Sequence, residues 1–440
     1  MIQTLSDILW GWPMVILLLG THIWLTVRLK FPQRHIFRAI RLSVTSEKGA
    51  SGDVSQFGAL ATALAATIGT GNIIGVATAI SLGGPGAVFW CWISGVFGIA
   101  TKYAESLLAV HYRVKTRDGH MVGGPMYVLH RGLGLKWLGV LFAALAVFAS
   151  FGIGSMVQCN AIAVLCHESY LVSTELVSSL VAFFVALVVL FGVKGIARVC
   201  MALVPFMAVL YVTGCIWILI LNGHYVWDAL LMIIQSAFTL EAAGGGFVGV
   251  SMILSIRYGV ARGLFSNESG MGSAPIVAAA AQTKSPVRQA LVSSTGTFWD
   301  TVVVCLLTGM VIVSSVLAHD GITFSNGATL TKHAFATIPV IGTPLLTFGI
   351  ITFAFSTILG WSYYGEKCVE YLGGSRFSRY VIWIYRVLFI VMVFVGGTCQ
   401  LDAVWSFSDL ANGLMAIPNL ISLLLLTGVI ARESRRGGVL

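Results

Sequence analysis

An apolar run from residue 55 to residue 81 is long enough to cross a membrane, yet the sequence A-A-T-I-G-T-G-N-I-I-G interrupts it at residues 65–75. A spanning helix satisfies its own backbone N–H and C=O groups, so unwinding at membrane depth requires side chains, water or a ligand as replacement partners. Three glycines leave the backbone bare here, with Thr67, Thr70 and Asn72 among or beside them. The interruption therefore predicts a site for an ion or a small polar solute.

The interrupted run is one of many apolar segments in a chain with few charges. Hydrophobic residues make up 57% of the chain and charged residues 10%, whereas soluble proteins carry about 25% charged residues. The segments with the ~20 apolar residues that a membrane span requires are eleven, at residues 8–29, 55–81, 85–111, 137–165, 171–193, 199–221, 226–258, 287–318, 343–368, 379–398 and 402–430. The sequence thus predicts an all-α polytopic membrane protein with eleven transmembrane helices.

Lysine and arginine concentrate in alternate loops between the predicted spans. With that spacing, 24 of the 26 basic residues fall on one side of the membrane, and only Lys332 in a loop and Arg386 inside a span depart from the pattern. Because cytoplasmic loops are rich in Lys and Arg, we expect the N-terminus outside and the C-terminus in the cytoplasm. This assignment places Arg257 and Arg262 in a cytoplasmic segment after the seventh span. The net charge of +9 is a topology signal and does not indicate a nucleic-acid partner.

A second glycine-rich interruption, A-A-G-G-G-F at residues 242–247, lies in the seventh predicted span. From the second span to the seventh is five helices, and a repeat with an odd number of spans must be inverted across the membrane. Paired broken spans at matching places point to the binding site of a secondary transporter; glycines that only permit close helix packing are the alternative. We expect one transmembrane domain over residues 1–440, with an extra N-terminal helix and basic loop (1–54), a first repeat (55–225) and an inverted second repeat (226–440).

The ends of the half-helices suit a zwitterionic solute. Helix N-terminal ends offer partial positive charge and N–H groups to a carboxylate, and C-terminal ends offer carbonyls to Na⁺ or an ammonium group. In the first interruption Thr70, Gly71 and Asn72 would donate, and the carbonyls of residues 65–68 would accept. An amino acid fits such a site without a buried side-chain charge.

Ionisable side chains inside the predicted spans are few, and each is a functional candidate. Glu241 precedes the second interruption, and Asp300 lies well inside the eighth span. Either carboxylate could hold a cation or the ammonium group of a substrate. The alternatives are a water-filled outer vestibule for Glu241 and local pairing for Asp300. Lys102 and Glu105, spaced i to i+3 in the third span, are interpreted as a neutralising pair near the cytoplasmic end.

Polar side chains in two other spans could complete the site. Thr352 and Ser356 share one face of the ninth span beside Thr357, and their hydroxyls suit a Na⁺ cage, although such hydroxyls often bond to their own helix. In the fourth span Gln158 follows the small-residue stretch F-G-I-G-S-M-V, and it either binds the solute or bonds to another helix. Two aromatic residues are candidate walls or gates of the pocket: Phe247 and Trp361.

Signatures of enzymes and of ATP-driven pumps are absent from the sequence. It has no H-E-x-x-H, G-x-S-x-G or Walker pattern, and the glycine-rich stretch at residues 263–275 lacks the G-K-[ST] of a phosphate-binding loop. The 8 cysteines lie mostly in apolar runs without C-x-x-C spacing, so we expect small buried side chains rather than disulfides or metal ligands. Asp7 at the start of a full-length span argues against a cleaved signal peptide. We therefore expect neither an enzymatic activity nor an organic cofactor.

Four stretches are the most specific motifs of the chain. They are I-G-T-G-N-I-I-G-V-A-T-A-I-S-L-G-G-P-G-A-V-F-W at residues 68–90, T-K-Y-A-E at 101–105, R-Y-G-V-A-R-G-L-F-S-N-E-S-G-M-G-S-A-P at 257–275 and P-V-R-Q-A-L at 286–291. These stretches resemble the alanine or glycine:cation symporters, and the likeness extends from residue 58 to the last span. The resemblance implies a LeuT-type inverted-repeat fold with one extra N-terminal helix. It also implies Na⁺-coupled uptake of alanine or glycine at a bacterial plasma membrane.

The resemblance assigns roles to individual residues. By the family's pattern, the substrate carboxylate meets the backbone of Thr70, Gly71 and Asn72, while Gly154 and Gln158 line the pocket. By analogy with the wider fold, two Na⁺ ions bind near the first interruption. The implied ligands are Ala65, Ile68, Ser356 and Thr357 for the first ion, and Thr67 and Asn72 for the second.

Two residues of the seventh predicted span bear on coupling and specificity. Glu241 departs from the family's pattern, which makes it a candidate proton carrier. Ser251 is a candidate for setting the size of the pocket, and hence which amino acid fits.

We expect secondary active symport of Na⁺ and a small neutral amino acid by alternating access, in a chain embedded in the lipid bilayer. One alternative is an H⁺-coupled transporter of the same fold, with Glu241 or Asp300 as the proton carrier. Another is a channel, which would conduct without counterflow; an intramembrane enzyme would need a catalytic constellation that the sequence lacks. Nothing in the sequence indicates an oligomeric state.

Overall fold

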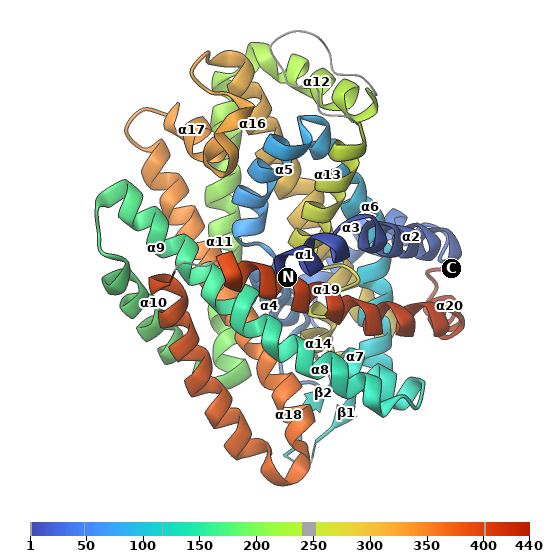
Figure 1. Ribbon diagram of the computed structural model, residues 1–440. Coiled ribbons are helices and arrows are strands. Elements are labelled where there is room, and N and C mark those ends of the chain that lie inside the picture. The colour runs from blue at the N-terminus through green and yellow to red at the C-terminus, as the bar shows by residue number, and fades with distance from the viewer. Residues whose placement is uncertain (1, 48, 117, 240–251, 400–401) are drawn as a thin grey trace.

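The computed structural model describes residues 2–47, 49–116, 118–239, 252–399 and 402–440. The chain is almost entirely helical, and its helices cross one another in a single bundle (Figure 1). The two strands of the described part, β1 (Val114–Lys115) and β2 (Met121–Val122), form a short antiparallel hairpin after α6. The prediction of an all-α architecture is therefore confirmed.

The first half of the chain contains eleven α-helices with short 3₁₀ and π segments between them. The α-helices are α1 (Ile2–Leu9), α2 (Trp12–Arg28), α3 (Ile36–Ser43), α4 (Gln56–Thr67), α5 (Val76–Gly83), α6 (Gly86–His111), α7 (Pro125–Tyr127), α8 (Lys136–Phe151), α9 (Val157–Tyr170), α10 (Thr174–Val189) and α11 (Gly192–Leu221). The short segments are the 3₁₀ turn η1 (Pro32–His35) and the π segments η2 (Gly71–Gly75), η3 (Val128–Gly132) and η4 (Gly152–Met156).

The described part of the second half continues with nine α-helices. They are α12 (Val226–Phe238), α13 (Met252–Asn267), α14 (Ala274–Ala278), α15 (Pro286–Thr297), α16 (Leu306–Ala318), α17 (Leu330–Ala336), α18 (Gly342–Thr398), α19 (Asp402–Leu425) and α20 (Thr427–Arg436). The short segments are η5 (Gly223–Tyr225), η6 (Phe298–Cys305) and η7 (Phe324–Thr329). Gly374 adopts a positive φ of 61° and turns α18 back on itself, so this helix supplies two antiparallel arms (Figure 1).

Local sequence determines where several helices begin. The Ser55 hydroxyl accepts a hydrogen bond from the Gly58 N–H at 3.0 Å and caps α4. Ser285 caps α15 in the same way through the Arg288 N–H, and Pro286 follows at the first helical position, where its missing N–H is harmless. Both helices thus start next to the loops that connect them to the rest of the bundle.

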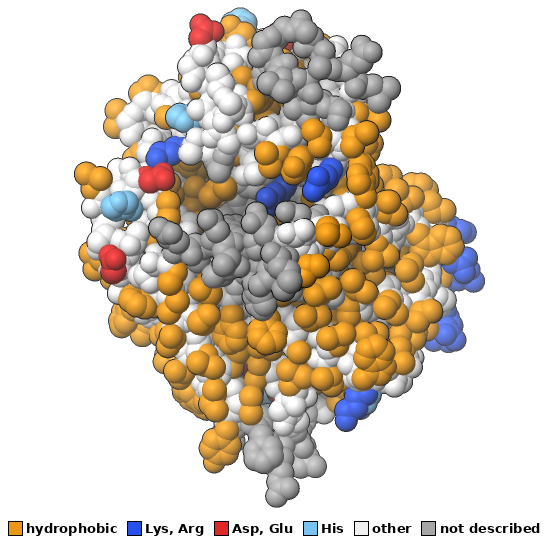
Figure 2. All heavy atoms as spheres, viewed as in Figure 1, with side chains coloured by type: hydrophobic (Ala, Val, Ile, Leu, Met, Phe, Trp, Pro, Cys, Tyr) orange, Lys and Arg blue, Asp and Glu red, His pale blue; other side chains and the backbone are white. Residues whose placement is uncertain are grey.

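Large hydrophobic side chains cover much of the surface. They are exposed along α10 and along the second arm of α18, including Phe183, Phe184 and Ile384. Figure 2 shows them as a broad apolar face, with Lys and Arg side chains gathered at one edge and acidic and His side chains at another. A soluble protein rarely exposes so wide an apolar face, so the lipid bilayer is its natural environment.

Seven helices of the described residues are long and apolar enough to cross a bilayer, or nine if each of two bent pairs forms one span. The bent pairs are α2 with α3, and α4 with α5. Helix α10 is apolar but shorter. The structure thus supports a multi-pass membrane protein, while the count of eleven spans stays a prediction.

The first predicted interruption is present. Helix α4 ends at Thr67, the next helical segment starts at Gly71, and the two are bent by 51° at the break. Ile68 has extended backbone angles, so its carbonyl leaves the helical direction. Nearby, a side chain at Gly360 of α18 would collide with the Ala66 backbone, so this glycine lets α18 approach closely beside the break.

The second predicted interruption, at residues 242–247, lies outside the described residues. On either side of it, α12 ends at Phe238 and α13 begins at Met252, and the Met252 N–H donates to the Thr239 carbonyl at 3.2 Å. A second interruption that the sequence did not predict follows α13, where the helix breaks after Asn267 and resumes at Ala274. Within this segment, the residues in the left-handed region of φ are Glu268, Gly270 and Gly272.

Backbone hydrogen bonds join the two interrupted segments at one end. The Asp53 N–H donates to the Ala280 carbonyl, and the Gln282 N–H donates to the Val54 carbonyl, both at 2.8 Å. They flank an isolated parallel bridge between Val54 and Ala281. The beginning of α4 and the chain just after α14 are therefore tied together.

The basic loops also meet at this end, with one exception. Arg113, which follows α6, donates to three carbonyls between residues 279 and 283. Arg257 and Arg262, however, lie on α13 and line a cavity together with Trp10, which directly precedes α2. They thus lie beside the residues that precede α2 and not beside the basic loop that follows it, so the structure does not group them with the other basic loops.

Candidate substrate and ion site

The fully buried Asn72 side chain organises the first interruption. Its Oδ1 accepts the Gly69 N–H at 2.9 Å and closes the unwound turn. Its Nδ2 donates to Asp300 Oδ1 at 2.8 Å. The amide oxygen therefore bonds within the turn, and the amide nitrogen bonds across to η6.

The Asp300 carboxylate lies where the two interruptions meet. It is fully buried on the π segment η6. Besides the Asn72 amide, its Oδ2 accepts the hydroxyls of Ser266 at 2.9 Å and Thr301 at 2.7 Å. Ser266 stands at the end of α13, just before the second interruption. A buried carboxylate is costly unless it is compensated, and the three neutral donors leave room for a cation to compensate it.

The Ala65 carbonyl is the meeting point of α4 and α18. It accepts the hydroxyl of Thr357 at 3.1 Å and that of Ser356 at 3.3 Å. Both hydroxyls also reach the Phe353 carbonyl of their own helix. The predicted oxygen-rich contact between the second and ninth spans is thus present in the structure.

Two predicted hydroxyls point elsewhere. The Thr67 hydroxyl bonds back to the Ala63 carbonyl of α4 at 3.1 Å, so only its backbone is directed toward the interruption. The Thr352 hydroxyl bonds to the Phe348 and Gly349 carbonyls, both on its own helix. Among the described residues, Thr352 therefore makes no hydrogen bond to α4, in contrast to Thr357.

Gln158 reaches the first interruption from the opposite side. Its Oε1 accepts the Thr70 hydroxyl at 3.2 Å, and its Nε2 donates to the Ile153 carbonyl in the π segment η4. The side chain is almost fully buried. Gln158 is thus positioned by its own helix to face the unwound turn at Thr70, and its role in binding the solute stays a prediction.

Gly154 and Trp361 form a tight contact. A side chain at Gly154 would place its Cβ 2.4 Å from the Trp361 Cβ, so only glycine fits. Trp361 is fully buried, and its Nε1 donates to Glu268 Oε1 at 3.1 Å. Glu268 also accepts the Ser273 hydroxyl. Glu268 was not among the residues predicted from the sequence, because N-E-S-G-M-G-S reads as a polar loop.

A cavity of about 210 Å³ opens onto the first interruption. Its walls come from the break, α5, α9 and α13, and its lining residues are Thr70, Gly71, Ile74, Gly75, Thr78, Ala161, Arg262 and Phe265. The guanidinium of Arg262 stands 5.7 Å from the centre of the Phe265 ring. The sequence missed both residues, because it assigned α13 in part to a cytoplasmic segment.

A second buried polar cluster adjoins the site. Glu105 on α6 accepts the Gly272 N–H at 3.0 Å and the Asn419 amide at 2.6 Å, both through Oε1. Lys102, one turn earlier on α6, makes no ion pair or hydrogen bond among the described residues. The prediction of a neutralising Lys102–Glu105 pair is therefore wrong, because Gly272 and Asn419 hold the carboxylate instead.

Comparison with known proteins identifies the family. The model of the sodium:alanine symporter family matches residues 1–436. This chain belongs to that family. It is 48% identical over 443 residues to the sodium/alanine symporter AgcS of Methanococcus maripaludis, covering 99% of this chain and 96% of the relative. An uncharacterized transporter of Haemophilus influenzae is 50% identical over 438 residues, covering 99% and 95%.

Solved structures give the same fold class. The crystal structure of MhsT in complex with L-phenylalanine matches with a TM-score of 0.62 at 15% identity, over 88% of this chain and 93% of the other. At this identity the likeness concerns the fold alone, which is of the LeuT type. The family and its structural neighbours are transporters, not enzymes.

Some residues predicted for the symporter site cannot be placed. Glu241, Phe247 and Ser251 lie outside the described residues, as does the glycine cluster at 242–247. Their assigned roles as coupling carboxylate, pocket wall and size determinant stay predictions.

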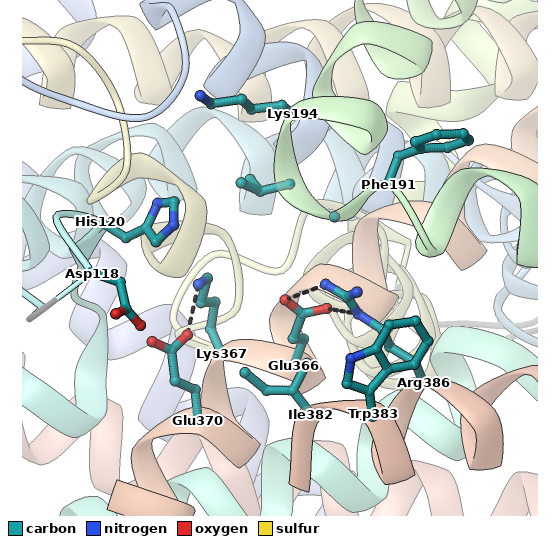
Figure 3. A pocket seen from close by; sticks show the side chains of 12 residues that line it. Asp118, His120, Phe191, Lys194, Glu366, Lys367, Glu370, Ile382, Trp383 and Arg386 are labelled. Atoms are coloured by element: carbon teal, nitrogen blue, oxygen red, sulfur yellow. Dashed lines mark hydrogen bonds and ion pairs between the residues drawn. The ribbon is translucent and has the colours of Figure 1, made fainter. Parts of the chain in front are cut away.

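The symporter has a separate charged cavity of about 390 Å³ where α11 begins and α18 turns back. Two ion pairs line it: Lys367 with Glu370 at 2.6 Å, and Arg386 with Glu366 through two hydrogen bonds of 2.8 and 3.1 Å. Figure 3 shows Arg386 between Glu366 and the ring of Trp383. Arg386, the basic residue inside a predicted span, is thus neutralised by a partner on the other arm of α18.

Proposed function

We propose that this chain is a Na⁺-coupled symporter that carries a small neutral amino acid, alanine or glycine, into the cell by alternating access. The observation that carries the proposal is the meeting of both interruptions at one buried carboxylate, since Asn72 and Ser266 both donate to Asp300. Membership of the sodium:alanine symporter family and similarity to AgcS support it. Broken helices around a buried site are the arrangement from which secondary transporters bind solute and ion.

The amino acid binds in the cavity at the first interruption. Its carboxylate meets the backbone at Thr70, Gly71 and Asn72, where the outer half-helix begins and its N-terminal end favours negative charge. Gln158 supplies a polar group beside it. Gly154 and Trp361 do not line this cavity; they pack against each other so closely that only glycine fits at position 154.

The first Na⁺ binds between α4 and α18. The carbonyls of Ala65 and Ile68 and the hydroxyls of Ser356 and Thr357 are its ligands. The residues fit, because two hydroxyls already converge on the Ala65 carbonyl and Ile68 turns its carbonyl out of the helix. Oxygen ligands suit a hard cation such as Na⁺.

The second Na⁺ binds at Asp300. Thr67 and Asn72 are the residues that the resemblance implies; the Asn72 amide oxygen accepts the Gly69 N–H, and its Nδ2 faces Asp300. To these we add Asp300, Ser266 and Thr301, because both hydroxyls donate to Asp300 Oδ2. This ion would neutralise the buried carboxylate and join the two interruptions. This Na⁺ binds one conformation of the carrier more tightly than the other, and that difference couples the Na⁺ gradient to transport. A ligand with equal affinity for both conformations would not shift the equilibrium between them.

The inverted repeat requires a revised boundary. The seventh span is α13 with α14, so that the second repeat starts at Met252 and α12 is a connecting helix rather than part of a span. The first repeat then runs from residue 55 to α11, and α2 remains the extra N-terminal helix. We propose that these repeats lie in a bacterial plasma membrane with the N-terminus outside and the C-terminus in the cytoplasm; the alternation of basic loops supports this orientation.

Uptake of labelled alanine into proteoliposomes tests the proposal. We expect an inward Na⁺ gradient at constant pH to drive accumulation, and unlabelled glycine or L-alanine to compete more strongly than D-alanine, serine or glutamine. Absence of Na⁺ stimulation would overturn the proposal. Stimulation by a pH gradient alone would favour H⁺ coupling, with Asp300 as the described candidate carrier, and absence of counterflow would favour a channel.

A further inference from the structure

Lys102 is a buried cation without a direct partner. Its side chain is 2% exposed on α6, and its Nζ has no hydrogen bond or ion pair among the described residues. Burying an ammonium group is costly unless nearby charges compensate it. The groups that interact with it electrostatically are three carboxylates: Glu105, Glu268 and Asp300.

These carboxylates belong to elements that border the proposed site. Glu105 is fixed by Gly272 and Asn419, and its Oε2 has no partner in the described structure. Glu268 lies in the second interruption and holds the Trp361 indole. Asp300 holds Asn72 of the first interruption. Lys102 therefore faces acidic groups that are connected to both broken helices, while no carboxylate holds it in place.

The charge balance of this interior depends on the transported ion. Lys102 acts electrostatically on Glu105, Glu268 and Asp300 alike, and a cation from solution adds to its charge. When Na⁺ leaves Asp300, a buried carboxylate loses its compensating charge, and the cost of that state is highest where water is excluded. The ammonium of Lys102 is tethered to α6 and stays when the ion leaves.

We propose that Lys102 acts as a resident countercharge that stabilises the ion-free carrier while it returns to load again. The proposal rests on the proposed Na⁺ symport. A flexible four-carbon stem and a compact charge suit lysine to this task. With Na⁺ bound, the ion neutralises Asp300, and the loaded carrier crosses without help from Lys102. Without Na⁺, Lys102 offsets the negative charge of Asp300 and Glu268, which lowers the barrier to the empty return.

Separate measurements of exchange and net transport test this inference. Exchange of labelled for unlabelled alanine, with Na⁺ on both sides, uses only the loaded carrier, whereas net uptake requires the empty return. In the Lys102→Met variant we expect net uptake to fall by about tenfold or more, with exchange changed by less than about twofold. Equal losses in both modes would indicate a structural role and overturn the inference.

Two further variants complete the experiment. Ser106→Ala removes a buried, unpartnered hydroxyl from the same helix and should leave both modes unchanged. Lys102→Arg keeps the positive charge, so it should retain net uptake even if Lys102→Met does not fold. If the Lys102→Arg protein folds and exchanges alanine but has lost net uptake, the inference is contradicted. If wild-type exchange is independent of Na⁺, the proposed symport itself fails, and the two failures are thereby distinguished.

Discussion

At the scale of single residues, two threonines on one helix have opposite surroundings. The Thr357 hydroxyl reaches across to Ala65 on α4, whereas the Thr352 hydroxyl bonds only to carbonyls of α18. Sequence spacing placed Thr352 on one face with Ser356, one turn away, and Thr357 beside them. Which of them contacts another helix depends on tertiary packing, and the sequence could not distinguish them.

This pair provides a matched test of the first ion site. We predict that Thr357→Ala raises the Na⁺ concentration for half-maximal alanine uptake about fivefold, since loss of one hydroxyl ligand costs ~1 kcal/mol. Thr352→Ala removes the same hydroxyl from the same helix and should leave this concentration unchanged. The Na⁺ dependence of uptake in proteoliposomes measures both. Equal Na⁺ dependence of the two variants would remove Thr357 from the site.

At the scale of elements, the first interruption was predictable and the second was not. Residues 65–75 combine glycines with flanking apolar residues, and no other stretch of that apolar run suggests a different place for the break. In the second repeat, residues 244–246 form the denser cluster of glycines, which drew the prediction there. Arg257 and Arg262 carry charges that are typical of a loop, so the sequence of α13 did not suggest part of a span. Their charges are accommodated because α13 faces polar cavities, a property that appears only when the helices pack.

The two arms of α18 yield a prediction about stability. Arg386 pairs with Glu366 in a mostly buried, two-bonded arrangement. Arg386→Met leaves the Glu366 carboxylate buried and unpaired, so we expect the free energy of unfolding in detergent to fall by ~3–5 kcal/mol. The double variant Arg386→Met/Glu366→Met should recover most of that loss.

An exposed pair serves as the control for this prediction. Lys332 and Glu168 lie 3.4 Å apart with much of both side chains in solvent, so Lys332→Met should cost less than ~1 kcal/mol. Thermal or denaturant unfolding followed by tryptophan fluorescence measures all three variants. A double variant that is less stable than Arg386→Met would contradict the role given to the pair.

At the scale of the whole molecule, the cavity at the first interruption implies a direction of access. It is bordered by Arg262 and Phe265 of α13, and the same two residues border the cavity at Trp10, near the N-terminal end of α2. Because the N-terminus is expected outside, this cavity belongs to the external approach to the site.

Chemical labelling tests that direction. We predict that Thr78→Cys, which lines the cavity, reacts with a membrane-impermeant maleimide applied from outside to oriented vesicles. Addition of Na⁺ with alanine should slow the reaction, because the occupied site closes the approach. The exposed Cys399 is replaced by Ser in the same background to remove its signal. Labelling only from the cytoplasmic side would reverse the proposed orientation.

The parallel β-bridge between Val54 and Ala281 connects the two interrupted segments through their backbones. The short ladder around it couples the start of α4 to the chain after α14, so neither inner half-helix can swing alone without rupturing backbone hydrogen bonds. Arg113 reinforces this connection through three carbonyls. In the proposed transport cycle, we therefore expect the two half-helices to move together.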